Sequence, residues 1–169
     1  WGKTSKRYEK EKPVSKDSLS TDLNLQGWRG EKLSAQWVVS AGKKDLNLSV
    51  EISDLKNRNN NQVISKEQIE SAFVRYVITD ELNKDQKGAC GHRLPANFDS
   101  TLVADVIDHK IKEFKVLKRT TRPGWLSIQV PQNTEPGLYS GTLKIKDGSK
   151  ILKKLIITIT VEERLLSAP

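Results

Sequence analysis

The chain has 169 residues, enough to bury roughly 70% of its unfolded surface in one domain or at most two, and no apolar run approaches the roughly 18 residues that cross a bilayer. Its formal charge of +8 is spread over many segments without a basic helix or interleaved aromatic residues, so we expect a solvated basic surface and no nucleic-acid partner. Cys90 is the only cysteine, which excludes an internal disulfide and a cysteine-cluster metal site.

The N-terminal third predicts a polar lead-in followed by three strands. Residues 1–18 are highly charged and without periodicity, which is typical of a mobile segment, and they contain no apolar signal-peptide core. Residues 23–25 indicate a short strand that ends at a bend over residues 27–30. Alternating apolar residues then predict strands over residues 33–39 and 46–52, and the second of these is the clearest strand in the sequence.

The middle of the chain is less regular. Residues 65–68 fit a capped helical turn, and residues 72–79 predict a central strand because both faces of such a strand would be apolar. Residues 80–100 show almost no periodicity, and a loop of about twenty residues within a compact domain suggests a function or a partner. Residues 102–111 fit one or two helical turns as well as they fit a strand, and the pattern leaves both open.

The last third, residues 122–161, predicts three consecutive antiparallel strands joined by turns. Asp147 begins the second turn. A two-residue turn would set Ile145 opposite Lys150, whereas a three-residue loop sets it opposite Ile151 and keeps the apolar side chains on one face. We therefore favour the three-residue loop.

Together these strands predict an all-β fold, a two-sheet antiparallel β-sandwich of the immunoglobulin-like or jelly-roll type. The sandwich is expected to span residues 19–162, and residues 163–169 are expected to begin a linker to a further domain. The predicted core consists of Trp37, Leu48, Val50, Phe73, Leu126, Ile128, Tyr139, Leu143, Ile157 and Ile159.

Five segments carry a resemblance to a known family. In chain order they are GWRGEKLSAQWVV (27–39), FVRYVITDELN (73–83), CGHR (90–93), LVADVID (102–108) and TRPGWLSIQVPQNTEPGLYSG (121–141). This ordered set resembles the N-terminal β-sandwich of family-123 glycoside hydrolases and related uncharacterised Bacteroidetes proteins. The resemblance covers about residues 20–161.

In that family a (β/α)8 barrel follows the sandwich and hydrolyses N-acetylgalactosaminides with the help of the substrate itself and an adjacent Asp–Glu pair. The resemblance implies that this chain is a non-catalytic domain whose partner is the barrel of the same polypeptide. It also implies a bacterial protein of the periplasm, the cell surface or the medium, whose export signal is not in this chain. An independent carbohydrate-binding module, with glycans as its partner, is the alternative.

Asp80 and Glu81 are the one carboxyl pair that imitates a glycosidase. Glycoside hydrolysis needs its two carboxyl groups roughly 5 to 9 Å apart across a sugar site, and adjacent residues at a strand end point to opposite sides. The resemblance assigns this pair to the sandwich and not to the catalytic barrel. His92 and His109 lack metal-ligand spacing, and the sequence contains neither a glycine-rich phosphate loop nor a nucleophile elbow. We therefore expect no catalysis by this chain, no metal and no cofactor.

The remaining candidates would contact a sugar or another domain. Trp28 would plug one end of the sandwich beside an Arg29–Glu31 pair, and Trp125 would stack on a sugar or cover a sheet edge. The loop around Cys90 is expected to lie against the barrel. Since no two tryptophans share a strand as a platform, we expect sugar binding to be weak or absent. The complete candidate set is Trp28, Arg29, Asp80, Glu81, Cys90, His92, Arg93 and Trp125.

Overall fold

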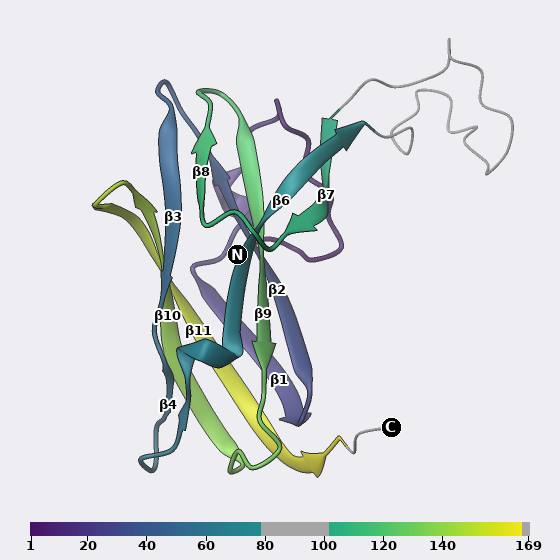
Figure 1. The fold of residues 1–169 in the computed structure, drawn as a ribbon, viewed down its shortest axis with the longest axis vertical. Helices are drawn as coiled ribbons and strands as arrows, with labels where there is room; N and C mark the ends of the chain where they lie inside the picture. Colours follow the sequence, from purple (N-terminus) through teal and green to yellow (C-terminus); the bar gives the residue numbers. More distant parts are fainter. Residues whose placement is uncertain (79–101, 167–169) are drawn as a thin grey trace, which may run out of the picture.

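Two facing β-sheets make up the computed structural model, which describes residues 1–78 and 102–166 (Figure 1). Within these residues the larger sheet contains β1 (Asp22–Arg29), β3 (Leu46–Ile52), β4 (Leu55–Asn57), β5 (Val63–Ile64), β8 (Glu113–Val116), β10 (Gly137–Asp147) and β11 (Lys150–Leu165). Its strand order is β1-β11-β10-β3-β8, with β4 paired to β10 and β5 to β4. β1 runs parallel to β11, whereas the other pairings of the named strands are antiparallel.

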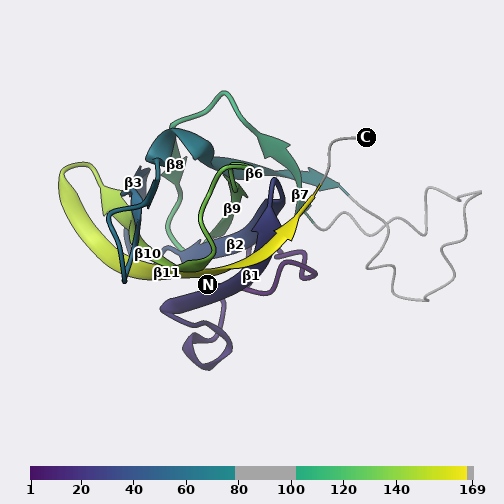
Figure 2. The same ribbon diagram turned by 90° about the horizontal axis from the view of Figure 1, so that it is seen from below.

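The smaller sheet has the order β2-β9-β6-β7, and Figure 2 shows it as a second layer above β1, β11 and β10. Its strands are β2 (Lys32–Ser40), β6 (Ile69–Ile78), β7 (Leu102–Asp108) and β9 (Thr121–Gln129). Two short 3-10 helices, η1 (Lys16–Ser18) and η2 (Lys66–Gln68), precede β1 and β6. The two-sheet β-sandwich is therefore confirmed.

Several local predictions are also confirmed. Ser65 caps η2 by accepting a hydrogen bond from the backbone N–H of Glu67, as the pattern of residues 65–68 indicates. β6 lies inside the smaller sheet, between β9 and β7, which agrees with a central strand. Residues 102–108, whose pattern fitted helix and strand equally well, form strand β7 because they pair with β6.

Inward-facing side chains of both sheets fill the core. Trp37 is fully buried, its ring meets that of Phe73 edge-on at 5.5 Å, and its Nε1 donates to Oγ of Ser71 at 3.0 Å. Gly124, opposite Trp37 on β9, leaves room for the indole ring, which a Cβ would overlap. Nine of the ten predicted core residues are buried; Val50 is half-buried because it borders a small surface hollow.

The N-terminal segment differs from the predicted lead-in. Trp1 and Tyr8 are buried, with exposed fractions of 7% and 4%. Backbone hydrogen bonds tie the segment to the smaller sheet, from Gly2 to Gln36 on β2 and from Ala104 on β7 to Tyr8. The physical reason is that two aromatic side chains in an otherwise polar segment gain more from burial than from solvent exposure. Mobility of residues 1–18 stays a prediction, and this burial argues against it.

The turn between β10 and β11 corrects the predicted three-residue loop. Asp147 pairs with Lys150, so the loop has two residues, and the register then shifts by one between Ile145 and Lys146. This β-bulge sets Ile145 opposite Lys153. A bulge adds one residue to one strand and restores the face on which the apolar side chains lie. The predicted alternation of apolar and polar residues along these strands is correct, but a β-bulge and not a three-residue loop maintains it.

Candidate functional site

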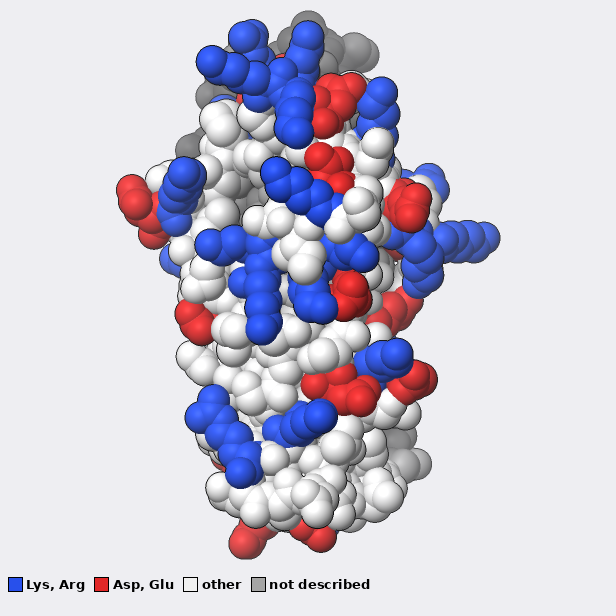
Figure 3. Space-filling view, turned by 90° about the vertical axis from the view of Figure 1, so that its left-hand side faces the viewer, with Lys and Arg blue, Asp and Glu red and all other residues white. Residues whose placement is uncertain are grey.

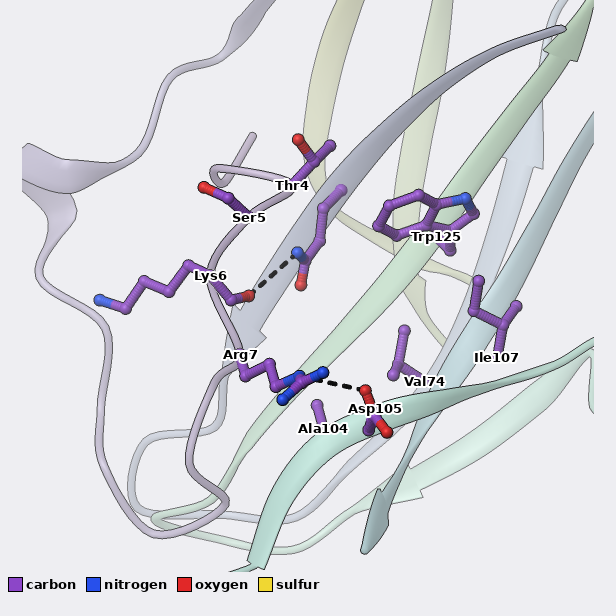
Figure 4. A pocket seen from close by; sticks show the side chains of 10 residues that line it. Thr4, Ser5, Lys6, Arg7, Val74, Ala104, Asp105, Ile107 and Trp125 are labelled. Atoms are coloured by element: carbon purple, nitrogen blue, oxygen red, sulfur yellow. Dashed lines mark hydrogen bonds and ion pairs between the residues drawn. The ribbon is translucent and has the colours of Figure 1, made fainter. Parts of the chain in front are cut away.

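An open hollow of about 670 Å³ lies on the outer face of the smaller sheet (Figure 4). Its floor comes from three strands, with Trp125 on β9, Val74 on β6 and Ile107 on β7. Residues 4–7 of the N-terminal segment form its rim. Small-molecule sites are usually hollows of about 300 to 1,000 Å³, so the volume fits a ligand. We refer to this hollow as the groove.

Gln36 on β2 holds the rim in place. Its side-chain Nε2 donates to the backbone carbonyl oxygens of Lys3 and Lys6, at 3.0 and 3.2 Å. The backbone carbonyl oxygen of Gln36 accepts from the N–H of Gly2 at 2.8 Å. Gln36 is 5% exposed, so the N-terminal turn supplies the hydrogen bonds that its buried amide needs. The N-terminal segment passes close to the sheet here, since a Cβ on Gly2 would overlap the side chain of Val38 on β2.

An ion pair crosses one side of the groove. Nε of Arg7 lies 3.1 Å from the carboxylate of Asp105, and both side chains are about half exposed. An exposed pair of this kind contributes about 0 to 1 kcal/mol to stability. The ion pair matters more for the shape and chemistry of the groove, because it places a planar guanidinium and a carboxylate in the same groove as Trp125.

Trp125 is the half-buried aromatic residue of this floor. Three other indole N–H groups donate within the protein: Trp1 to the carbonyl oxygen of Ile156, Trp28 to Glu162 and Trp37 to Ser71. Within residues 1–78 and 102–166, Nε1 of Trp125 has no acceptor. An indole N–H and part of a ring are therefore open to a ligand.

The groove suits binding rather than covalent chemistry. It combines an aromatic ring, apolar side chains, exposed hydroxyls at Thr4 and Ser5, and one ion pair. Among the described residues no three His, Cys, Asp or Glu side chains gather as metal ligands would. His109 lies in the described part of the chain, and its Nδ1 is 2.8 Å from Oε1 of Glu70.

Among the described residues, no helix has the length and apolar character to cross a membrane.

A family model described as the glycoside hydrolase 123 N-terminal domain matches residues 1–147. The chain belongs to this family. The match begins at the N-terminal segment, so the rim of the groove lies inside the region that defines a glycoside hydrolase 123 N-terminal domain. No curated protein sequence matches the chain.

One solved structure agrees with the family match at the level of fold. A family 123 glycoside hydrolase from Clostridium perfringens, studied for glycolipid glycan hydrolysis, is similar with a TM-score of 0.71 and 19% identity. The similarity covers 89% of this chain and 24% of that one, so the glycoside hydrolase 123 N-terminal domain spans about a quarter of that enzyme. A PapD-like domain of human CEP192 gives a TM-score of 0.49 and 7% identity over 86% of this chain and 84% of that domain.

Trp28 and Arg29 lie away from the groove. Trp28 is on the outer face of the larger sheet, where Nε1 donates to Glu162 at 2.9 Å and the guanidinium of Arg164 stacks 4.6 Å from the ring centroid. The expected Arg29–Glu31 pair is wrong. Arg29 donates to the carbonyl oxygen of Glu163, while Glu31 accepts the backbone N–H of Trp28. Trp28 therefore covers the sheet surface and does not plug an end of the sandwich.

The other predicted candidates lie outside the described residues. They are Asp80, Glu81, Cys90, His92 and Arg93. Of the eight candidates, the structure thus places three, and it brings only Trp125 into a groove.

The sequence reasoning missed the rim and Asp105. Residues 4–7 were assigned to a lead-in, and Asp105 was part of a segment with no assigned structure. One signal was available: Trp1 and Tyr8 are large aromatic residues in a charged segment, and such residues usually find a surface to cover. The partner surface could not be found, because it lies on strands far away in the sequence.

Proposed function

We propose that the chain is the non-catalytic domain that supports a following (β/α)8 barrel, in an enzyme that acts on N-acetylgalactosaminides. The family match over residues 1–147 is the observation that carries the proposal. The Clostridium perfringens enzyme supports it, because the shared fold occupies only 24% of that glycosidase. The family resemblance further supports a bacterial protein of the periplasm, the cell surface or the medium.

The test compares three proteins: the product of the complete reading frame, the same product without this domain, and the 169-residue chain alone. We expect the complete product to hydrolyse an aryl N-acetylgalactosaminide and the 169-residue chain to give no turnover. Removal of the domain should lower the thermal stability of the barrel. Turnover by the chain alone that is lost on Asp80→Asn or Glu81→Gln would overturn the non-catalytic assignment.

We also propose that residues 88–96 contact the barrel. Arg93→Glu should then destabilise the complete product more than the isolated chain, because a charge reversal is costly where a partner surface buries it. Lys43→Glu, at an exposed position in the loop between β2 and β3, is the matched control and should leave both unchanged. Equal effects of Arg93→Glu on both proteins would reject this contact.

The groove around Trp125 favours a second candidate function, an independent carbohydrate-binding module. Such a module keeps its affinity for glycans when it is separated from a catalytic domain, whereas a purely supporting domain has none. The two functions are compatible within one chain.

A further inference from the structure

We propose that the groove on the outer face of the smaller sheet binds a pyranose unit of a glycan, with Trp125 as its stacking surface. The inference goes beyond the supporting role, because it requires neither the barrel nor catalysis. It also revises the expectation of weak or absent sugar binding, which treated residues 1–18 as separate from Trp125.

The indole of Trp125 supplies the apolar half of sugar recognition. Aromatic rings carry negative charge density on their faces, and the C–H groups on one side of a pyranose are weakly positive, so the two surfaces attract each other. Val74 and Ile107 continue the apolar floor on the neighbouring strands. The N–H of Trp125, which has no acceptor in the described part of the chain, adds a donor at the edge of the same ring.

The rim supplies the polar half. Asp105 accepts and Arg7 donates hydrogen bonds in planar, charge-assisted geometries, and vicinal sugar hydroxyls both donate and accept. The hydroxyls of Thr4 and Ser5 lie on the same rim (Figure 4). Sugar hydroxyls can therefore form hydrogen bonds with the half-exposed carboxylate of Asp105 and with the exposed hydroxyls of Thr4 and Ser5.

The rim is a built part of the fold rather than a loose tail. The buried amide of Gln36 donates to two carbonyl oxygens of the N-terminal turn, and the buried Tyr8 anchors the segment on the far side of Arg7. A groove whose walls are held in this way loses little conformational entropy when a ligand enters.

Other ligand classes fit the groove less well. A purely apolar segment would bury the Arg7–Asp105 pair without giving new hydrogen bonds, which is costly. A polyanion would meet the carboxylate of Asp105, while the Lys and Arg side chains gather on the face that carries β3 and the β10–β11 hairpin (Figure 3). A neutral ring with an apolar face and several hydroxyls matches all the groups present.

The test titrates the 169-residue chain with a panel of neutral and sulfated oligosaccharides, by calorimetry and by tryptophan fluorescence. We expect a neutral oligosaccharide to bind, and Trp125→Ala to weaken it at least about tenfold, which corresponds to about 1.4 kcal/mol. Asp105→Asn, an exposed change that should not affect folding, should also weaken binding. Trp28→Ala is the matched control, because Trp28 lies on the other sheet, and it should bind like the wild type.

Three outcomes would overturn the proposal. The first is no binding of any oligosaccharide by a folded wild-type chain. The second is a loss of affinity that is equal in Trp125→Ala and Trp28→Ala. The third is binding of sulfated glycans alone that persists in Trp125→Ala. That result would assign the affinity to the lysine-rich face, the face that carries β3 and the β10–β11 hairpin (Figure 3). None of these results bears on the turnover of the complete enzyme, so the supporting role is tested separately.

Discussion

The outer face of the smaller sheet carries Ala72, Val74 and Trp125, whereas that of the larger sheet carries residues such as Thr142 and Lys144. The N-terminal segment lies against the first face, and Ala72 and Val74 are buried. Among the described residues the second face is largely polar, and Lys and Arg side chains gather over part of it (Figure 3). The outer face of the smaller sheet is therefore apolar and partly covered, whereas that of the larger sheet is largely polar and exposed.

This difference explains where sequence reasoning succeeded. A sheet with one solvated face alternates between apolar and polar residues, and that alternation identified β3 and β10 without ambiguity. The residues of β6 are apolar on both faces of the strand, and this pattern correctly predicted a central strand. The pattern did not show which segment covers the outer face. The cover is the N-terminal segment, whose contacts with β2 and β7 are long-range and leave no periodic trace in the sequence.

The same limit applies to the candidate site. Trp125 could be selected from its strand alone, because it alternates with Leu126 and Ile128 in the core. Arg7 and Asp105 could not, since only the fold brings the rim and β7 to the same tryptophan. The bulge opposite Ile145 is a similar case, because sequence alternation cannot distinguish a longer loop from an inserted residue.

The largest expected effect is in the core that both sheets share. Leu48 on β3 is fully buried, so Leu48→Ala should lower the free energy of unfolding by about 2 to 5 kcal/mol, as for other core truncations. Leu117→Ala is the matched control, because Leu117 is 48% exposed. Urea unfolding measures both, and a loss below about half a kcal/mol for Leu48→Ala would place it outside the core.

A pair of glutamines compares the two outer faces directly. Gln36→Ala should cost about 1 to 3 kcal/mol, because it removes the two hydrogen bonds that the buried Gln36 amide donates to the carbonyl oxygens of Lys3 and Lys6. Gln26, on the larger sheet, bonds Glu162 at an exposed position, so Gln26→Ala should change stability by less than about 0.5 kcal/mol. Trypsin should also cleave the N-terminal segment faster in Gln36→Ala. Equal effects of the two substitutions would mean that Gln36 does not hold the N-terminal segment against the smaller sheet.

The two sheets should also respond differently to pH. Burial raises the pKa of Tyr76 on β6 to about 12, against the opposing effect of Arg122, whose guanidinium lies 4.5 Å from the ring centroid. A raised pKa favours the folded state at low pH, so this stability is complete below the unfolded pKa of about 10 and is lost as the pH rises toward 12. Tyr76→Phe should remove this alkaline loss. Absorbance titration of the phenolate in both proteins is the measurement, and an unchanged titration curve would contradict the assignment.

On the larger sheet the corresponding shift acts at acid pH. The hydrogen bond from Lys144 lowers the pKa of Glu51, so its contribution is present at neutral pH and is lost as the pH falls. Because Glu51 is exposed, this contribution should be weak and sensitive to salt.

The smallest expected effect is on the lysine-rich face itself. Lys144 and Lys154 are directly opposite on β10 and β11, and like charges in this position destabilise a sheet. Lys154→Glu replaces the repulsion by an attraction and should stabilise the protein by roughly 0.2 to 1 kcal/mol at low ionic strength. Lys154→Gln removes only the repulsion and should give a smaller gain. Urea unfolding at low and high salt separates these terms, because salt screens exposed charges and should bring both variants toward the wild type. A gain that persists at high salt would have to come from packing, and the open face of the larger sheet would then resemble the covered face of the smaller one.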